Sequence, residues 1–264
     1  MPQLTLVAFW GDKPPAFQRY LAEIGGRIGA SPLGARFTPY APEQIHATIV
    51  GLERMENEPG CYNLNQFLTT GERRSMDLAA ALGLARAWPR LTVRFGGFDP
   101  DDDRVTSFGQ TPFVRSFQLR RKAGKVMLMG WLHADGDFRR AGELWRLRRR
   151  FAEEAAVRPK YWADHDFYLT LGTLTLPTDA APSSAKPSAA EAFQATMRDY
   201  IAANPIDVIV SAADLAFVRY VDPALPLNGS SAYPVEEVGL DAQKLASLYT
   251  SRAGERIARG PQNI

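Results

Sequence analysis

The segment Ile45-His46-Ala47-Thr48-Ile49 has a partial second copy in Phe167-Tyr168-Leu169-Thr170-Leu171, where tyrosine stands in place of histidine. Both segments are rich in residues that favour strands. Successive side chains of a strand point to opposite faces, so the polar residues of each segment share one face and the apolar residues share the other. Two such strands side by side would line a groove with imidazole and hydroxyl groups.

Around the first segment, the pattern predicts the order β-α-β-α-β. A compact apolar run, Leu4 to Trp10, is followed by a stretch with helical spacing that begins near Phe17. After the strand at 45–52 come an irregular stretch from Glu53 to about Ser75, a helix from Met76 to Trp88, and a strand from Leu91 to Phe95.

The second half repeats this order after an acidic turn at 99–103. The sequence predicts a hairpin at 116–132, a helix at 138–156, a strand at 167–176, a helix at 189–203, and one or two strands at 206–221. Residues 177–188 are expected to be a linker, and 222–264 a C-terminal extension. We therefore predict one α+β domain over 1–264, with two similar, interdigitated lobes, about 1–98 and 116–221. Their mostly antiparallel sheets would face a central groove.

Composition limits the classes of protein and ligand that fit this chain. The chain has 264 residues, a net charge of +2 and a pI near 8.7, which permits a phosphate-bearing ligand but does not suggest a binder of duplex DNA. Its single cysteine, Cys61, rules out an internal disulfide. The N-terminus does not resemble a secretory signal, and no apolar run is long enough to cross a bilayer, so we expect a cytoplasmic protein without a membrane partner.

The two polar motifs and the duplicated order resemble the two-histidine (2H) phosphoesterase superfamily, which includes bacterial 2′-5′ RNA ligase-like and cyclic nucleotide phosphodiesterase proteins. The resemblance is carried by the opening strand, by His46-Ala47-Thr48-Ile49, by Tyr168-Leu169-Thr170-Leu171, and by a closing strand near Leu215-Ala216-Phe217-Val218. It implies a bilobal fold, a nucleotide or RNA-end phosphodiester as ligand, and no metal or other cofactor.

Carried onto matching positions, the resemblance makes His46 a general acid or base and lets Thr48 and Thr170 hold phosphate oxygens. Tyr168 departs from the family pattern, which has a second histidine there. A phenol is a weak base at neutral pH but donates a hydrogen bond. The sequence therefore leaves three interpretations open: a phosphodiesterase that acts on a 2′,3′-cyclic phosphate or 2′-5′ linkage, a nucleotide-binding pseudoenzyme, and a protein-interaction domain.

Other polar residues have simpler interpretations. His165 stands three residues before Tyr168, and strand parity places it on the face away from the groove unless a bulge intervenes. The basic residues at the hairpin tip are expected to be exposed: Arg120, Arg121 and Lys122. The arginines of the 138–156 helix are expected to form its solvated face, with a nucleic-acid or phosphate patch as the alternative: Arg139, Arg140, Arg146, Arg148, Arg149 and Arg150.

Overall fold

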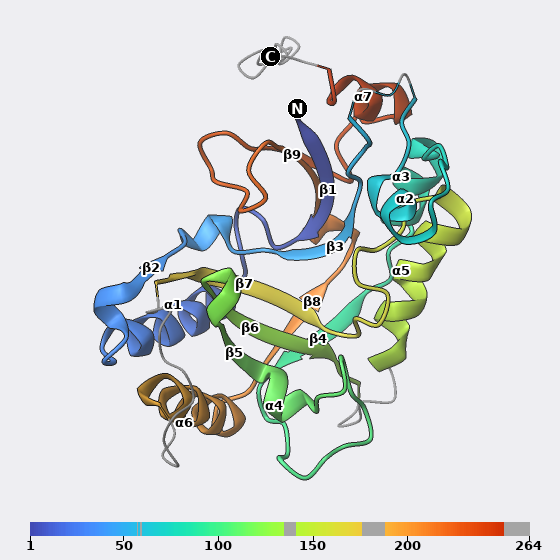
Figure 1. Cartoon of the computed structure of the whole chain (residues 1–264). Coiled ribbons are helices and arrows are strands. Elements are labelled where there is room, and N and C mark those ends of the chain that lie inside the picture. Colours follow the sequence, from blue (N-terminus) through green and yellow to red (C-terminus); the bar gives the residue numbers. More distant parts are fainter. Residues whose placement is uncertain (57, 59, 135–140, 176–187, 251–264) are drawn as a thin grey trace, which may run out of the picture.

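A computed structural model describes residues 1–56, 58, 60–134, 141–175 and 188–250. Its strands form one ten-stranded sheet with helices packed against it, and every pairing between named strands is antiparallel (Figure 1). The predicted α+β class with a mostly antiparallel arrangement is confirmed. No helix in the described part of the chain is long and apolar enough to cross a membrane.

The strands follow the alternating patterns of the sequence closely. They are β1 (Gln3–Ala8), β2 (Phe37–Pro39), β3 (Ala47–Gly51), β4 (Leu91–Phe95), β5 (Phe117–Arg120), β6 (Lys125–Leu132), β7 (Phe167–Leu174), β8 (Ile206–Val210), β9 (Leu215–Tyr220) and β10 (Ser231–Pro234). The α-helices are α1 (Pro15–Gly29), α2 (Leu64–Thr70), α3 (Leu78–Arg86), α4 (Pro112–Ser116), α5 (Ala141–Ala155), α6 (Ala189–Ala203) and α7 (Ala242–Ser247).

Strand parity separates a core face from an open face. Alternate residues of the central strands, such as Leu4 and Leu6 of β1 and Leu169 of β7, belong to one large apolar cluster shared with α1, α3, α5 and α6. The residues between them, such as Thr48 and Tyr168, face the other way and are only partly buried. These four helices therefore cover one face of the sheet, and the polar segments lie on the opposite face.

The strand order runs symmetrically outward from the β3–β7 pair. On one side come β1 and then β9; on the other come β6 and then β4. Strand β4, from the first half of the chain, lies beside β6 from the second half, and β9 from the second half lies beside β1. The two expected sheets are joined into one because β3 and β7 pair at Ala47 and Leu169. Descent of the two halves from a duplication stays a prediction.

Two stretches carry more structure than their sequence suggested. The 53–75 stretch, expected to be irregular, contains α2, because Asn63 caps its first turn by accepting a hydrogen bond from the Gln66 amide and Gly71 ends it in a left-handed conformation. The C-terminal extension contains β10 and α7. Most of the predicted 177–188 linker, the start of the predicted 138–156 helix and the chain beyond 250 lie outside the described residues.

Candidate functional site

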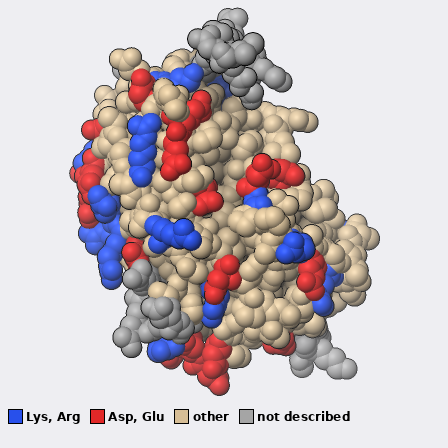
Figure 2. Space-filling view, turned by 180° about the vertical axis from the view of Figure 1, so that it is seen from behind, with Lys and Arg blue, Asp and Glu red and all other residues tan. Residues whose placement is uncertain are grey.

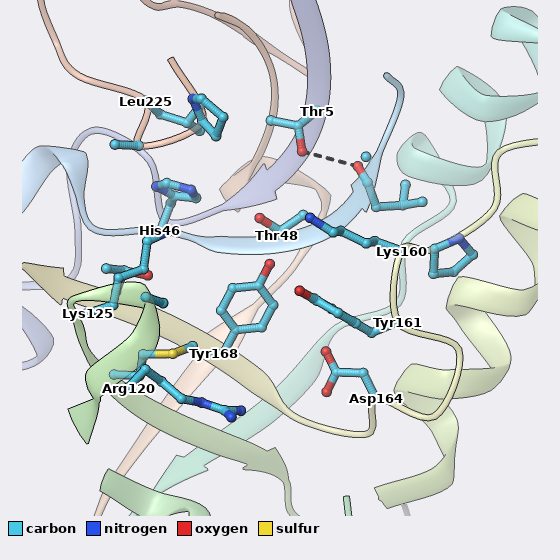
Figure 3. Close-up of a pocket in the computed structure, with 18 of the residues that line it drawn as sticks. Thr5, His46, Thr48, Arg120, Lys125, Lys160, Tyr161, Asp164, Tyr168 and Leu225 are labelled. Carbon is cyan, nitrogen blue, oxygen red and sulfur yellow. Dashed lines mark hydrogen bonds between the residues drawn. The ribbon is translucent and has the colours of Figure 1, made fainter. Parts of the chain in front are cut away.

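A cavity of about 600 Å³ lies on the open face of the sheet, over the β3–β7 pair (Figure 3). All four residues singled out from the sequence line it: His46, Thr48, Tyr168 and Thr170. Ala47 pairs with Leu169, so the antiparallel register sets His46 opposite Thr170 and Thr48 opposite Tyr168. The two segments are thus cross-strand neighbours, and their polar side chains enter one cavity.

His46 lies just before β3 and is held in one tautomer. Its Nδ1 is 2.7 Å from the backbone carbonyl of Gln44, which can only accept, so Nδ1 carries the proton in the neutral ring and Nε2 is left as the acceptor. Burial lowers the pKa of His46 to about 4, and the positive charges of Lys13 and Lys125 add to the effect, whereas the Gln44 carbonyl opposes it. At neutral pH the ring is therefore uncharged.

Tyr168 has the opposite character. Burial raises the pKa of its phenol to about 12, and although the Thr48 side chain and Arg148 pull the value down, Asp164 raises it further. At neutral pH the phenol keeps its proton and is a hydrogen-bond donor. Figure 3 shows its hydroxyl directed toward Thr48 and Tyr161 across the cavity. The site thus combines a neutral imidazole that accepts a proton with a phenol that donates one.

Basic side chains from two loops complete the lining. Arg120 and Lys125 come from the β5–β6 hairpin, and Lys160 comes from the loop between α5 and β7. None of these three forms an ion pair with another described residue. Figure 2 shows the back of the molecule, where basic and acidic side chains are interspersed and much of the surface is uncharged. The described part of the back therefore has no cluster of basic side chains like the one in the cavity. An anion in the cavity would meet unpaired positive charge.

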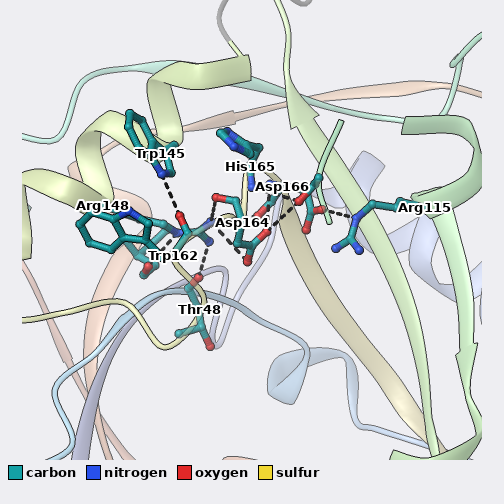
Figure 4. Close-up of polar contacts among 10 residues, drawn as sticks. Thr48, Arg115, Trp145, Arg148, Trp162, Asp164, His165 and Asp166 are labelled. Carbon is teal, nitrogen blue, oxygen red and sulfur yellow. Dashed lines mark hydrogen bonds and ion pairs between the residues drawn. The ribbon is translucent and has the colours of Figure 1, made fainter. Parts of the chain in front are cut away.

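Arg148 lines the cavity and connects both motif segments (Figure 4). Its Nε donates to the Ile49 carbonyl and its Nη2 donates to the Thr48 carbonyl, each at 2.9 Å. Its Nη1 lies 3.3 Å from the backbone carbonyls of Asp164 and Asp166, and 3.5 Å from the Asp164 carboxylate. Arg148 was expected on the solvated face of its helix, and that expectation is wrong. It follows Leu144 by four residues and precedes Phe151 by three, so it lies on the buried stripe of α5.

A second buried arginine anchors the same loop. Arg115 of α4 donates through Nε to Asp166 at 2.6 Å, and both side chains are almost completely buried. Burial and the neighbouring Asp164 raise the pKa of Asp166 to about 7, whereas Arg115 lowers it. Two arginines and two aspartates therefore fix the residues that lead into β7, and with them the position of Tyr168.

The C-terminal extension forms one wall. Pro223, Ala224 and Leu225 line the cavity on the side of His46. The Gln44 amide donates to the Ala224 carbonyl at 2.8 Å, and the Trp10 indole donates to the Leu225 carbonyl at 3.4 Å. Hydrogen bonds thus connect the turn before His46 and the end of the first strand region to residues 224 and 225.

His165 is not among the residues that line the cavity. Its ring stacks on Trp145 with centroids 6.0 Å apart, on the outer side of the loop (Figure 4). The sequence predicted that His165 would face away from the groove; it does not line the cavity, although it lies in the loop before β7 and not in the strand itself. Among the described residues, no group of three or more His, Cys, Asp or Glu side chains could hold a metal ion.

The other arginines of the predicted 138–156 helix divide into two groups. Arg139 and Arg140 lie outside the described residues, whereas Arg146 and Arg150 are exposed as expected.

Sequence reasoning missed several lining residues. Arg120 was assigned only to an exposed hairpin tip, and it is exposed, but the tip reaches the cavity. Lys125 and Lys160 carried no local signal, because neither lies in a motif. The position of Arg148 on an apolar stripe was a usable signal, since a charge on a buried face needs partners.

Comparison with known proteins found no family model and no curated protein that matches this chain. Among solved structures, it is similar to TT0787 of Thermus thermophilus, with 18% identity, a TM-score of 0.37, and coverage of 89% of this chain and 95% of that one. It is also similar to apo LigT of E. coli, with 16% identity, a TM-score of 0.36 and the same coverage.

Proposed function

We propose that this protein binds a nucleotide phosphodiester, such as a 2′,3′-cyclic phosphate or a 2′-5′ linkage, and processes it without a metal. The observation that carries the proposal is the cross-strand setting of His46 opposite Thr170 and of Thr48 opposite Tyr168, inside a cavity with unpaired basic side chains. Threonine and tyrosine hydroxyls donate to phosphate oxygens, and the nearby cations balance the ligand's negative charge.

In this proposal His46 is the base. Its free Nε2 takes a proton from water as the water oxygen forms a bond to phosphorus. The bond from phosphorus to the leaving oxygen breaks while Tyr168 donates a hydrogen bond to the phosphate or to that oxygen. The proton held by the His46 imidazolium then passes through water to the leaving oxygen, which departs as a hydroxyl and returns His46 to its neutral form. An anion bound beside His46 raises its pKa, which makes the imidazole a stronger base in the complex than in the free protein.

A second candidate function is capture of the same ligand without cleavage. The pKa values favour it, because a base with a pKa of about 4 and a donor with a pKa of about 12 both lie far from neutral pH. Proton transfer is most effective when the catalytic pKa is near the working pH. Slow turnover and stoichiometric binding are therefore the two outcomes that the experiment must separate.

The test is a mass-spectrometric assay of the purified protein without added metal. The ligands are 2′,3′-cyclic nucleotides, 2′-5′ oligonucleotides and cyclic dinucleotides, and His46→Ala is compared with His165→Ala. Loss of product in His46→Ala but not in His165→Ala supports a phosphodiesterase with one histidine. Ligand retained without product, in wild type and in His46→Ala, supports the binding protein. Failure to bind or convert any of these ligands contradicts both.

A further inference from the structure

A tight turn beside the cavity carries an aromatic residue where glycine or asparagine is usual. Ser107 and Gln110 exchange two backbone hydrogen bonds, of 3.0 and 3.1 Å, around the two-residue tip Phe108-Gly109. The φ angles of the tip residues are 51° and 70°. Positive φ at both central positions is the signature of a type I′ turn, which strongly prefers Asn-Gly or Gly-Gly. Phenylalanine in this region is a rare and strained choice.

Several contacts hold the tip in place. The Ser107 hydroxyl is buried, accepts from the His165 amide at 3.1 Å, and donates to the Asp164 carboxylate at 3.5 Å. The side-chain amide of Gln118 donates through Nε2 to Gln110 Oε1 at 2.7 Å. The guanidinium of Arg115 lies 4.9 Å from the centre of the Phe108 ring. A strained residue that its surroundings hold so firmly is typical of a functional position.

Phe108 meets a second aromatic residue at the mouth. Its ring packs edge-on against Tyr161, with centroids 5.8 Å apart and planes at 81°. Both residues line the cavity, yet Phe108 is 47% exposed and Tyr161 is 48% exposed. Several large hydrophobic side chains are exposed among the described residues, and Phe108 and Tyr161 are the two that are aromatic. Two exposed rings gathered at one rim of a polar cavity form a specific apolar surface.

We infer that Phe108 and Tyr161 form a stacking platform for the base of the bound nucleotide. The inference rests on the proposed function, and it narrows the ligand to phosphodiesters that carry a nucleobase. The ring planes lie at 81°, so a planar base stacks on the exposed face of one ring and meets the edge of the other, while its phosphate reaches Thr170 and the basic side chains. Stacking uses the face of the base and not its edge, so the platform accepts all bases and binds purines more tightly than pyrimidines.

The experiment compares two ligands on the full chain by calorimetry: adenosine 2′,3′-cyclic phosphate and methyl riboside 2′,3′-cyclic phosphate, which lacks the base. The variant Phe108→Gly suits the positive φ of the tip and is expected to keep or raise the melting temperature of the ligand-free protein. It is expected to weaken binding of the adenosine ligand by about fivefold to 150-fold and to leave the base-free ligand unchanged. Tyr161→Leu serves as a second variant, and Phe108→Trp should retain adenosine affinity.

The possible failures are distinguishable. Equal affinity of wild type for the two ligands, or unchanged adenosine affinity in Phe108→Gly and Tyr161→Leu, overturns the platform and leaves the proposed function standing. Equal weakening of both ligands by Phe108→Gly also overturns it, because the residue would then act on the phosphate site. Binding of neither ligand by wild type excludes a 2′,3′-cyclic phosphate as the ligand, and with it the platform inferred from that ligand.

Discussion

His46 and Tyr168 show how the environment sets the role of a side chain. Both enter the same cavity, and burial moves their pKa values in opposite directions because it disfavours the charged form of each. For imidazole the charged form is protonated, and for phenol it is deprotonated. The free protein therefore holds a neutral acceptor and a neutral donor across a wide range of pH. An anionic ligand would raise the pKa of His46 toward neutral pH.

His46 makes folding stability depend on pH. The unfolded imidazole binds a proton near pH 6.5, whereas the folded one binds it only near pH 4, so the unfolded state gains protons first as the pH falls. As the pH falls from 6.5 to 4, we expect the free energy of unfolding of wild type to decrease by about 1–3 kcal/mol more than that of His46→Gln. Urea denaturation of both proteins across this range measures the difference. Parallel pH profiles for the two proteins would contradict the lowered pKa.

Tyr168 can be tested by removing a single hydroxyl. Tyr168→Phe keeps the ring and deletes the donor, so we expect turnover, or affinity where there is no turnover, to fall about tenfold to 100-fold with little change in melting temperature. Tyr40→Phe, which removes another hydroxyl from the cavity lining, is the matched control. Tyr168→His should raise turnover if the geometry suits a second imidazole. Unchanged kinetics in Tyr168→Phe would remove this residue from the mechanism.

At the scale of elements, the site depends on helix α5, which contributes Arg148 to the cavity lining. Helix α5 sends Arg148 to the carbonyl groups of β3 and to the loop before β7. The fork-shaped guanidinium bonds both segments at once, which a lysine cannot do. The relative position of His46 and Tyr168 is therefore set by a third element as well as by the pairing of their strands.

Arg148 is expected to be important for both stability and ligand binding. Arg148→Met leaves the buried Asp164 without its ion pair and frees two carbonyl groups of β3, so we expect a loss of about 3–5 kcal/mol in unfolding free energy. Arg146→Ala, on the exposed side of the same helix, should stay within about 0.5 kcal/mol of wild type. Chemical denaturation measures both. Similar losses in the two variants would contradict the connecting role of Arg148.

At the scale of the whole molecule, the C-terminal extension belongs to the same core as the strands β3 and β7 that form the floor of the site. Tyr249 is buried in the large apolar cluster, and its hydroxyl donates to the Leu52 carbonyl at 2.6 Å, immediately after β3. Arg219 of β9 donates to the Leu248 carbonyl at 2.8 Å. Residues near 250 therefore stabilise the strand that follows His46, and the extension is not an appendage.

Substitution at Tyr249 tests this unity. Tyr249→Phe removes one hydrogen bond and should cost about 1 kcal/mol, whereas Tyr249→Ala also leaves a cavity and should cost about 3–5 kcal/mol. Unfolding should remain a single transition when followed by tryptophan fluorescence and by circular dichroism. Two separate transitions, or a negligible loss in Tyr249→Ala, would show that the extension unfolds on its own.

The sequence by itself determined the strands of the two motifs, the longer helices and the polar face of each motif. Alternation at 45–52 and 167–176 follows from local geometry, because a strand turns every second side chain to the same face. It also predicted the break between β8 and β9, but not that these consecutive strands would lie in distant parts of the sheet. Local periodicity carries no information about which strands become neighbours.

Only the tertiary structure decided which residues meet. The pairing of β3 with β7 sets His46 opposite Thr170, the β5–β6 hairpin brings Arg120 to the cavity, and the fold buries Arg148 against backbone carbonyl groups. Phe108 takes a strained conformation that its own sequence does not favour, because contacts from distant segments hold it. Electrostatic and hydrogen-bonding partners are chosen by proximity in space, and proximity exists only after the chain has folded.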